Sequence, residues 1–445
     1  MLGEYVITGR RAAQIAASVE RAVGAGELEP GQLLPPMREL AERLGVNPNT
    51  VAAAYRTLRE RGVIETAGRR GSRVRPRPAT TGREYIRVDV PEGVRDLADG
   101  NPDVALLPPL AEVFAAAAAQ GDREPVLYGA GPVEPELARI ARADLDADGV
   151  PDGPVAVTSG SLDAIERVFA VHLKPGDAVA VEDPGWGSVL DLVPALGLRV
   201  VPVGVDDEGP LPGDVRRALE GGACALVVTD RAQNPTGAAV SAARARALRS
   251  VLREHPETLL IEDDHGYRIV DQALHPLAGV THHWAFVRSV AKAYGPDLRL
   301  AVLTGDAATV DRVRGRQRLG PGWVSRLVQR AVVRLRAGGA VDARVVAVAY
   351  SRRRDALIGA LARRGVEACG VSGMNVWIRV PDETGAVARL LHAGWAVAPG
   401  ARFRMNAPQG IRITISTLTD EEIGRVADAV ASAIGSVSGD GDRYV

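Results

Sequence analysis

Short apolar runs alternate with helical patterns between residues 155 and 303, and this alternation constrains the fold more than any other feature of the chain. Seven runs rich in Val, Ala and Leu are separated by stretches whose apolar residues recur at helical spacing. They are Val155–Val157, Ala178–Val181, Val200–Val203, Ala225–Val228, Leu259–Ile261, Ala285–Val287 and Ala301–Leu303. Such alternation predicts an α/β fold with a mostly parallel sheet. Beyond residue 340 the pattern predicts a long helix and a smaller C-terminal α+β domain, which ends in an amphipathic helix from about Asp420.

A separate module is predicted at the N-terminus, over residues 10–77. Helical patterns cover residues 11–24, 36–44 and 48–61. Two short strands are expected within residues 63–75, around a tip rich in Gly and Arg. A helix, a turn, a second helix and a basic hairpin in this order predict a winged helix-turn-helix, an α+β fold.

The charge of this module predicts a nucleic acid as its partner. Residues 1–78 hold thirteen arginines and eight glutamates, a net charge of +5, which leaves −6 for the remainder of a chain whose total is −1. The third helix would enter the major groove by its N-terminal turn. Arg69 and Arg70 at the hairpin tip would lie near the sugar–phosphate backbone or the minor groove. A three-helix scaffold with a solvated basic face is the alternative interpretation of the same pattern.

Three segments of the module resemble the GntR-type DNA-binding domain in their order and spacing. They are Leu34–Ala41, Leu44–Val51 and Gly68–Ser72. The resemblance implies that the module binds double-stranded operator DNA, with phosphate contacts from Arg38 and Thr50. It also implies base or backbone contacts from Asn47 and Asn49. Asn47 precedes Pro48 and is the expected N-cap of the third helix.

The rest of the composition limits the kind of protein. Residues 78–95 carry Pro, Thr and Gly with little apolar pattern, which predicts a linker before a body at 96–445. Two cysteines are too few for a disulfide framework or a multi-cysteine metal site, and this suits a reducing cytoplasm. No signal peptide is recognised, and the longest apolar stretch, around 104–119, is too short to span a bilayer. We therefore expect a cytoplasmic protein with no metal and no membrane partner.

Lysine is almost absent from the chain, so each lysine that remains calls for an explanation. Of 54 basic residues only Lys174 and Lys292 are lysines. A lysine can lose its proton and form a Schiff base with an aldehyde, whereas arginine cannot. Lys174 lies in a predicted helix-ending turn, where a cation suits the helix dipole. Lys292 lies between a predicted strand and a turn. A plain surface charge is one interpretation of Lys292, but the neighbouring motifs favour a chemical role.

Polar motifs follow the predicted strands, at the places where α/β folds bind their ligands. Thr158–Ile165 is a turn of small residues that opens a helix and suits a phosphate. Glu182–Trp186 and Asn234–Gly237 are turns, and Ile261–His265 ends an apolar strand with three acidic residues. Such a cluster needs a cation or a hydrogen-bond donor. Arg412 lies alone in an apolar strand, where it requires an anionic partner.

In this order the motifs resemble those of the fold-type I aminotransferases that use pyridoxal 5′-phosphate, and the match covers nearly the whole body. The resemblance implies that Lys292 forms the internal aldimine with the cofactor. It implies that Asp263 pairs with the protonated pyridine nitrogen, so that the ring stays an electron sink. Asn234 would donate a hydrogen bond to the ring 3-oxygen, and Trp186 would stack on the ring face. Arg412 would bind the carboxylate of an incoming amino acid.

The same resemblance implies a phosphate site and a dimer. The phosphate would be held by Gly160, Ser161, Ser289 and Arg299. Tyr128, in the sequence Leu-Tyr-Gly, is similar to the tyrosine that reaches the phosphate in the neighbouring subunit, which implies a homodimer.

Two positions depart from the pattern or leave it open. His265 stands where relatives usually have a tyrosine near the 3-oxygen, and Tyr267 is close by in the sequence. Asp264 remains an alternative to Asp263 as the partner of the pyridine nitrogen.

A GntR-like module followed by an aminotransferase-like body is the layout of the MocR regulators, which this chain resembles. The layout implies a dimeric transcription factor that senses pyridoxal phosphate, or an amine or amino acid that reacts with it at Lys292. An active aminotransferase with a DNA-binding head is the rival hypothesis, since Lys292, Asp263 and Arg412 are all present. A body that serves only for dimerisation is a third.

Overall fold

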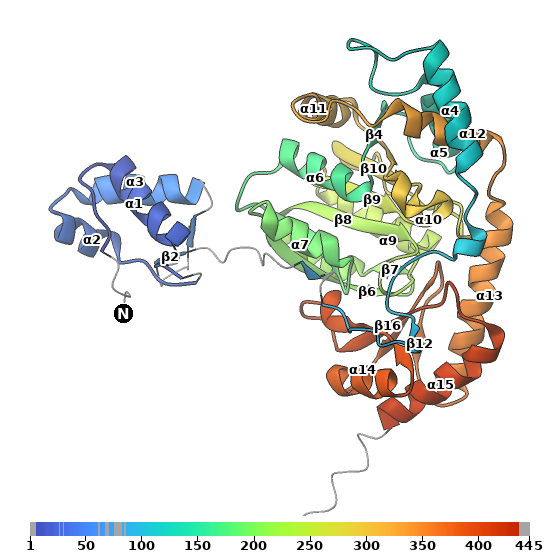
Figure 1. Cartoon of the computed structure of the whole chain (residues 1–445). Helices are drawn as coiled ribbons and strands as arrows, with labels where there is room; N and C mark the ends of the chain where they lie inside the picture. Colours follow the sequence, from blue (N-terminus) through green and yellow to red (C-terminus); the bar gives the residue numbers. More distant parts are fainter. Residues whose placement is uncertain are drawn as a thin grey trace, which may run out of the picture. The chain divides into compact units, whose positions relative to one another are not determined.

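The computed structural model describes residues 6–25, 27–29, 31–60, 63–66, 71–74, 82–83 and 86–435. The chain divides near residue 80 into an N-terminal head and a body, each considered by itself below (Figure 1). Arg69 and Arg70, expected at the tip of the hairpin, lie outside the described residues.

The head is the winged helix-turn-helix that the sequence predicts. Its elements are α1 (Ala12–Ala25), α2 (Met37–Leu44), α3 (Pro48–Glu60), β1 (Ile64–Thr66) and β2 (Ser72–Val74). The helices begin and end within one residue of the predicted bounds, and β1 pairs antiparallel with β2.

The core of the head is built from one face of each helix. On α3 the spacing of Val51, Ala54, Tyr55 and Leu58 places all four side chains inside, as predicted. The Tyr55 hydroxyl donates a 2.8 Å hydrogen bond to the Pro35 carbonyl, which ties α3 to the segment before α2. The opposite face of α3 is therefore free for another partner.

The body contains an eight-stranded sheet in the order β4-β11-β10-β9-β8-β5-β6-β7 (Figure 1). Its strands are β4 (Val155–Thr158), β5 (Ala178–Asp183), β6 (Arg199–Asp206), β7 (Gly209–Pro210), β8 (Ala223–Arg231), β9 (Leu259–Asp264), β10 (His283–Ser289) and β11 (Ala301–Gly305). All seven predicted strands are present. The pairs β5–β8, β8–β9 and β9–β10 are parallel, and β11 runs antiparallel between β4 and β10.

Helices cover this sheet. α6 and α11 contact β4, β10 and β11, whereas α8 contacts β5 and β8. The helices of this part of the body are α4 (Ala111–Arg123), α5 (Pro135–Ala147), α6 (Ser161–His172), α7 (Gly187–Ala195), α8 (Pro212–Glu220), α9 (Ala242–Glu254), α10 (Ala291–Tyr294), α11 (Ala307–Arg318) and α12 (Arg326–Ala337). Helices on a mostly parallel sheet leave the ends of the strands as the place for a ligand.

A smaller lobe follows the long helix α13 (Ala343–Ala362). Its four-stranded sheet has the order β12-β13-β16-β15 and packs with α14 (Glu383–His392) and α15 (Asp420–Gly435). The strands are β12 (Ala368–Cys369), β13 (Asn375–Arg379), β15 (Ala398–Pro399) and β16 (Gly410–Thr414). A separate pair joins β3 (Arg95–Asp96) to β14 (Trp395–Ala396).

Two arginines of the predicted linker bind the body. Arg83 forms an ion pair with Asp191 and donates hydrogen bonds to the carbonyls of Ala401 and Arg404. Arg95 pairs with Glu422 at 3.0 Å. Arg83 and Arg95 therefore attach the described part of the predicted linker to the body. No helix among the described residues has the length and apolarity needed to cross a membrane.

Candidate functional site

The residues that follow β4, β5, β8, β9 and β10 line one cavity of about 410 Å³. That volume lies within the range of small-molecule sites. Parallel strands bring their carboxyl ends to the same edge of a sheet, so residues far apart in the sequence meet there. The predicted cofactor residues that line the cavity are Gly160, Ser161, Trp186, Asn234, Ser289, Lys292 and Arg299.

Lys292 lies in the one-turn helix α10, directly after β10, and is half-buried. Its ammonium nitrogen is 3.4 Å from the Gly100 carbonyl oxygen. Burial, followed by repulsion from Arg412, lowers the pKa of Lys292 to about 8, although Asp263 acts in the opposite direction. A sizeable fraction of the amine is therefore neutral near physiological pH and available as a nucleophile.

An anion site lies at the N-terminus of α6. Gly160 precedes the helix with φ of +97°, and a Cβ there would come within 3.1 Å of the Arg299 guanidinium. The Ser161 hydroxyl oxygen is buried and has no hydrogen-bond partner in the part of the chain that the structure describes. Among the described residues, the side chain of Arg299 donates one hydrogen bond, of 3.4 Å, to the Ser159 carbonyl. Helix N–H groups, a free hydroxyl and a guanidinium together suit a phosphate.

Asp263 and Asp264 at the end of β9 have different surroundings. Asp264 forms ion pairs with Arg231 at 2.7 Å and with Arg288 at 3.0 Å. In Asp263 one carboxylate oxygen is 2.9 Å from the His265 ring, and the other is buried with no hydrogen-bond partner among the described residues. Asp263 therefore retains an acceptor for a ligand, whereas Asp264 is occupied by two arginines.

The residue beside the cavity after β9 is His265 and not Tyr267. His265 lines the cavity and meets the edge of the Trp186 ring, with centroids 5.0 Å apart. The Tyr267 hydroxyl donates a 2.5 Å hydrogen bond to Asp144 instead. His265, and not Tyr267, therefore lies beside the Trp186 ring.

Arg412, on β16, lies inside the body and contacts Asn234. It is only 2 % exposed, donates a 2.9 Å hydrogen bond to the Asn234 side-chain oxygen, and lies over the Phe403 ring. Among the described residues no carboxylate forms an ion pair with it. Burial, followed by repulsion from Arg402, lowers the pKa of Arg412 to about 9, so the guanidinium is still charged at neutral pH. A buried cation without an anion suits a ligand carboxylate.

The structure keeps Tyr128 away from this cavity and adds residues that the motifs did not indicate. Tyr128 is 95 % exposed and contacts only the edge of Trp323 among aromatic rings. The turn Gly100-Asn101-Pro102 and Ser188 also line the cavity. Their residue types are common in any turn, so only their proximity in space distinguishes them.

These groups fit pyridoxal 5′-phosphate. A partly neutral lysine suits its aldehyde, the α6 N-terminus with the free Ser161 hydroxyl suits its phosphate, and the unpaired oxygen of Asp263 suits its pyridine nitrogen. Two of these matches, at Ser161 and Asp263, rest on a buried atom that has no hydrogen-bond partner among the described residues.

The head presents the polar residues expected to meet DNA. Arg38 on α2 and both Asn47 and Asn49 at the start of α3 are exposed, and Thr50 is half-buried beside them. The Asn47 side chain accepts a 2.8 Å hydrogen bond from the Asn49 N–H, as a helix N-cap does.

Comparison with known proteins agrees with both parts. Residues 93–430 match the family Aminotransferase class I and II, and residues 11–74 match the bacterial regulatory proteins of the gntR family. Aspartate aminotransferase from Thermus thermophilus with maleate has a TM-score of 0.67 and 28 % identity, and the match covers 76 % of this chain and 91 % of that one.

Two relatives share the whole layout. The chain is 40 % identical to the vitamin B6 salvage pathway transcriptional repressor PtsJ of Salmonella typhimurium, over 96 % of this chain and 100 % of the relative. It is 27 % identical to the transcriptional regulator TauR of Rhodobacter capsulatus, over 86 % of this chain and 88 % of that one. The chain therefore belongs to the MocR-type transcriptional regulators, in which a gntR-family DNA-binding domain is joined to an aminotransferase-like domain whose cofactor is pyridoxal 5′-phosphate.

Proposed function

We propose that this regulator binds operator DNA through its head and changes that binding when pyridoxal phosphate, or an amine or amino acid, occupies the body. Residues 10–77 would form the DNA-binding domain, 78–95 the linker, and 96–445 the cofactor-binding and dimerisation domain. The observation that carries the proposal is Lys292, which lines the cavity and has a lowered pKa, in a chain that also holds a helix-turn-helix.

The predicted cofactor residues have distinct roles in this proposal. When bound, the cofactor supplies an electron sink for an amine attached to it. Lys292 would hold it covalently, and Asp263, oriented by His265, would accept a hydrogen bond from its ring nitrogen. Asn234 would donate to the ring oxygen and Trp186 would cover the ring face. The phosphate would lie against Gly160, Ser161, Ser289 and Arg299.

The buried Arg412 is our proposed recognition site for an effector carboxylate. It lies beside Asn234 and close enough to Lys292 to lower the pKa of that amine. An anionic effector would neutralise Arg412, which among the described residues has no ion-pair partner. The name of the 40 % identical relative points to vitamin B6, so the cofactor itself is the first effector to test.

DNA would be held by the exposed face of the head. Asn47 and Asn49 would meet base edges or the backbone, Arg38 and Thr50 would meet phosphates, and Arg69 and Arg70 would meet the backbone or minor groove. Because chromosomal DNA would be its target, we place the protein in the cytoplasm.

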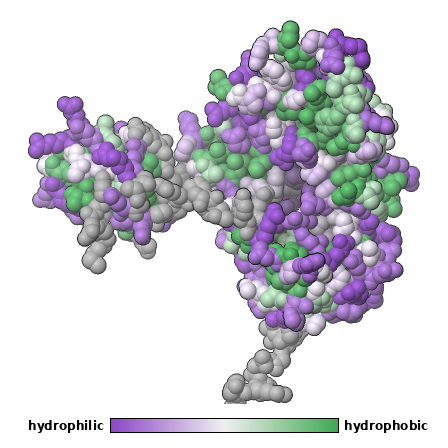
Figure 2. All heavy atoms as spheres, viewed as in Figure 1, coloured by the Kyte–Doolittle hydropathy of each residue, from purple (hydrophilic) through white to green (hydrophobic). Residues whose placement is uncertain are grey.

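A homodimer would complete the cofactor site. Tyr128 is 95 % exposed, and Leu127, Val104 and Leu319 are each more than 70 % exposed. Figure 2 shows hydrophobic residues gathered on the upper part of the body, over the region of α4 and α12 in Figure 1. Exposed apolar side chains of this size favour burial by a second subunit. We propose that Tyr128 then reaches the phosphate in the partner's cavity.

The experiment is DNA binding, measured with fragments from upstream of the protein's own and adjacent genes, with and without pyridoxal phosphate. We expect the affinity to change at least about fivefold with cofactor, the lower end of typical coupling between two sites. The Lys292→Ala variant should bind DNA equally well and lose that response. Tight DNA binding that ignores both cofactor and amines would refute the proposal.

Steady-state transamination tests the rival enzyme hypothesis on the same preparation. Turnover of paired amino and keto acids at about 1 per second or faster, the ordinary range for enzymes, would make the body a working aminotransferase. Slow single-turnover chemistry alone would leave the regulator as proposed.

A further inference from the structure

Two buried polar side chains, Glu182 and Gln233, connect the loops that carry Trp186 and Asn234. Trp186 and Asn234 both line the cofactor cavity, and they follow β5 and β8 respectively. Glu182 lies near the end of β5 and is 6 % exposed, whereas Gln233 follows β8 and is fully buried. Neither of the two lines the cofactor cavity. Any effect that they have on a ligand there must pass through the residues that they hold.

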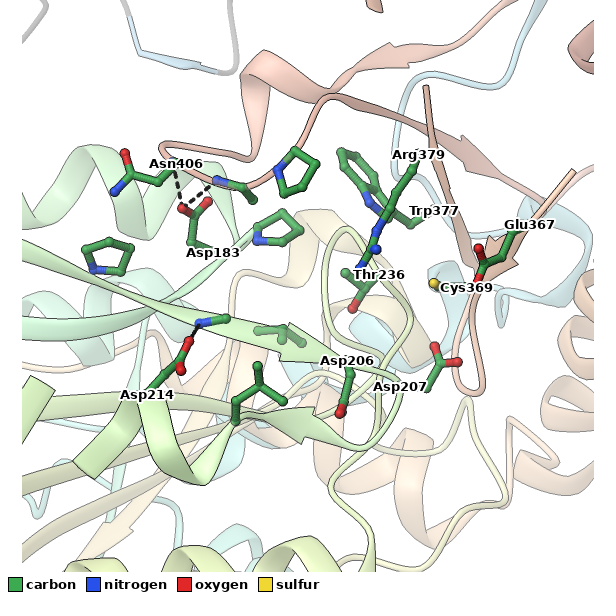
Figure 3. A pocket seen from close by; sticks show the side chains of 17 residues that line it. Asp183, Asp206, Asp207, Asp214, Thr236, Glu367, Cys369, Trp377, Arg379 and Asn406 are labelled. Carbon is green, nitrogen blue, oxygen red and sulfur yellow. Dashed lines mark hydrogen bonds between the residues drawn. The ribbon is translucent and has the colours of Figure 1, made fainter. Parts of the chain in front are cut away.

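Glu182 and its neighbour Asp183 point to opposite sides of β5. Figure 3 shows Asp183 turned toward the loop before β16, where it accepts hydrogen bonds from the N–H groups of residues 405–407. Because side chains alternate along a strand, Glu182 faces the other way. One of its carboxylate oxygens accepts a 2.9 Å hydrogen bond from the Thr229 N–H, and the other accepts a 3.0 Å hydrogen bond from the Gln233 side-chain nitrogen.

Both of these contacts require an oxygen of Glu182 as the acceptor. Burial raises the pKa of Glu182 to about 7, while hydrogen bonds from Thr229 and Gln233 oppose the rise and the charge of Asp263 adds to it. Above pH 7 the side chain is therefore mostly a carboxylate, which has an acceptor at both oxygens and no donor. An amide in its place would have one acceptor atom, so one of the two N–H donors would face another donor.

Only one orientation of the Gln233 amide satisfies its neighbours. Its nitrogen donates to Glu182 and, at 2.9 Å, to the Pro184 carbonyl. Its oxygen accepts hydrogen bonds from the Thr236 N–H at 2.9 Å and from the Thr236 hydroxyl at 2.6 Å. In the reversed orientation the amide oxygen would face the Pro184 carbonyl, and the amide nitrogen would face the Thr236 N–H. The Glu182 carboxylate thus helps to fix the orientation, because an unpaired buried donor or acceptor is costly.

Through this amide the two loops beside the cofactor cavity are joined to each other. Pro184 comes two residues before Trp186, and Thr236 comes two residues after Asn234. Since Gln233 holds both Pro184 and Thr236, it determines how far apart the Trp186 and Asn234 side chains lie.

We propose that Glu182 is a positioning residue for the cofactor ring. Through Gln233 it sets the distance between Trp186, which would cover the ring face, and Asn234, which would donate to the ring oxygen. This role rests on the proposed function, since it takes the ring to lie between these two side chains. The proposed phosphate site, at the N-terminus of α6, contains none of these residues. Glu182 should therefore affect the binding of the ring and leave the binding of phosphate alone unchanged.

The test is the binding of pyridoxal phosphate to the full-length protein, freed of bound cofactor, at pH 8, with inorganic phosphate as a competitor. Glu182→Gln should weaken the binding of pyridoxal phosphate by at least about fivefold, because one buried hydrogen bond is lost. The visible circular dichroism of the bound cofactor should also change, because the ring is held differently. The inhibition constant of inorganic phosphate should keep its wild-type value.

Glu262→Gln is the matched control. Glu262 is also a buried glutamate at the end of a strand of the same sheet, and it does not line the cofactor cavity. Its carboxylate accepts a hydrogen bond from the Leu277 N–H. This variant should bind pyridoxal phosphate as the wild type does.

An exchange of the two side chains tests their contact directly. Gln233→Glu alone places two carboxylates against each other and should weaken the binding of pyridoxal phosphate more than Glu182→Gln does. Adding Glu182→Gln pairs an amide with a carboxylate again, in the reverse order. The double variant should therefore bind at least about fivefold more tightly than Gln233→Glu alone. Near-ultraviolet circular dichroism of the cofactor-free variants checks that each is folded.

Wild-type affinity for pyridoxal phosphate in Glu182→Gln would overturn the positioning role. An equal loss in Glu262→Gln, an equal loss for inorganic phosphate, or no recovery in the double variant would overturn it as well. These outcomes leave the proposed function intact, because the wild type still binds the cofactor. A wild type that binds no pyridoxal phosphate would instead overturn the proposed function together with this role.

Discussion

Asp263 and Asp264 are neighbours in the sequence, and the alternation of side chains along β9 gives them different roles. Asp264 forms ion pairs with Arg231 and Arg288, all three side chains being at least nine-tenths buried. Asp264→Asn should therefore lower the free energy of unfolding by about 3 kcal/mol, because it leaves two buried guanidinium groups without their shared anion. Asp263→Asn should leave that free energy nearly unchanged and weaken the binding of pyridoxal phosphate instead. Urea unfolding of the cofactor-free protein and a cofactor titration measure the two effects.

A reversed outcome, with Asp264→Asn stable and unable to bind the cofactor, would exchange the two roles. The sequence alone leaves both acids as candidates because it predicts the strand but not which side of the sheet each of the two side chains faces.

Two further acids, Asp230 and Glu262, are buried side by side on β8 and β9. Within the described residues, both oxygens of Asp230 and one of Glu262 have no hydrogen-bond partner. Burial raises the pKa of Glu262 to about 7, and burial together with the Glu262 charge raises that of Asp230. The folded protein thus keeps a proton on Glu262 between pH 4.5 and about 7, where the unfolded chain has released it.

Stability should consequently fall as pH rises through that window, by about 3 kcal/mol for a shift of this size. Glu262→Gln should remove the share of the slope that belongs to Glu262, because an amide stays neutral at every pH, and the slope that remains belongs to Asp230 and Glu182, whose pKa values burial also raises. Urea unfolding at pH 5 and pH 7.5 measures it, with the exposed Glu257→Gln as control. A slope equal in wild type and Glu262→Gln would show that Glu262 is ionised in the folded protein.

Two exposed asparagines at the start of α3, Asn47 and Asn49, differ in what their side chains contact. Asn47 accepts a hydrogen bond from the Asn49 N–H, whereas no protein atom binds the Asn49 side chain among the described residues. Asn47→Ala should lower the stability of the head by about 1 kcal/mol and also weaken DNA binding. Asn49→Ala should leave stability unchanged and weaken specific DNA binding by about 1–3 kcal/mol if it reads a base. Thermal unfolding and operator titration separate them; equal effects on both readouts would contradict the assignment.

Prediction from the sequence succeeded for elements that a local pattern of residues identifies. The apolar runs predicted the strands because six of the seven (β4, β5, β8, β9, β10 and β11) are buried along nearly their whole length, whereas β6 is only partly buried. The order of the strands depends on tertiary packing, so β11, antiparallel between β4 and β10, carries no local signature. The strand-end motifs were brought together as expected, but Gly100 and Ser188 joined them only through the fold.

At the scale of the whole molecule, Arg83 connects the segment after the head to two parts of the body. It forms an ion pair with Asp191 on α7 and donates hydrogen bonds to carbonyls on both sides of Phe403, the ring beneath Arg412. An effector that binds Arg412 would shift Phe403 and its loop. Arg83 would pass that shift to the segment that leads back to the head.

We therefore expect Arg83→Gln to separate sensing from response. The variant should bind pyridoxal phosphate and DNA with wild-type affinity when each is measured alone. It should lose most of the cofactor-dependent change in DNA affinity, because coupling requires an element whose position both sites influence. The exposed Arg139→Gln, which breaks only a surface ion pair on α5, is the matched control and should keep the full response. If Arg83→Gln responds to the cofactor as the wild type does, the signal reaches the head by another path.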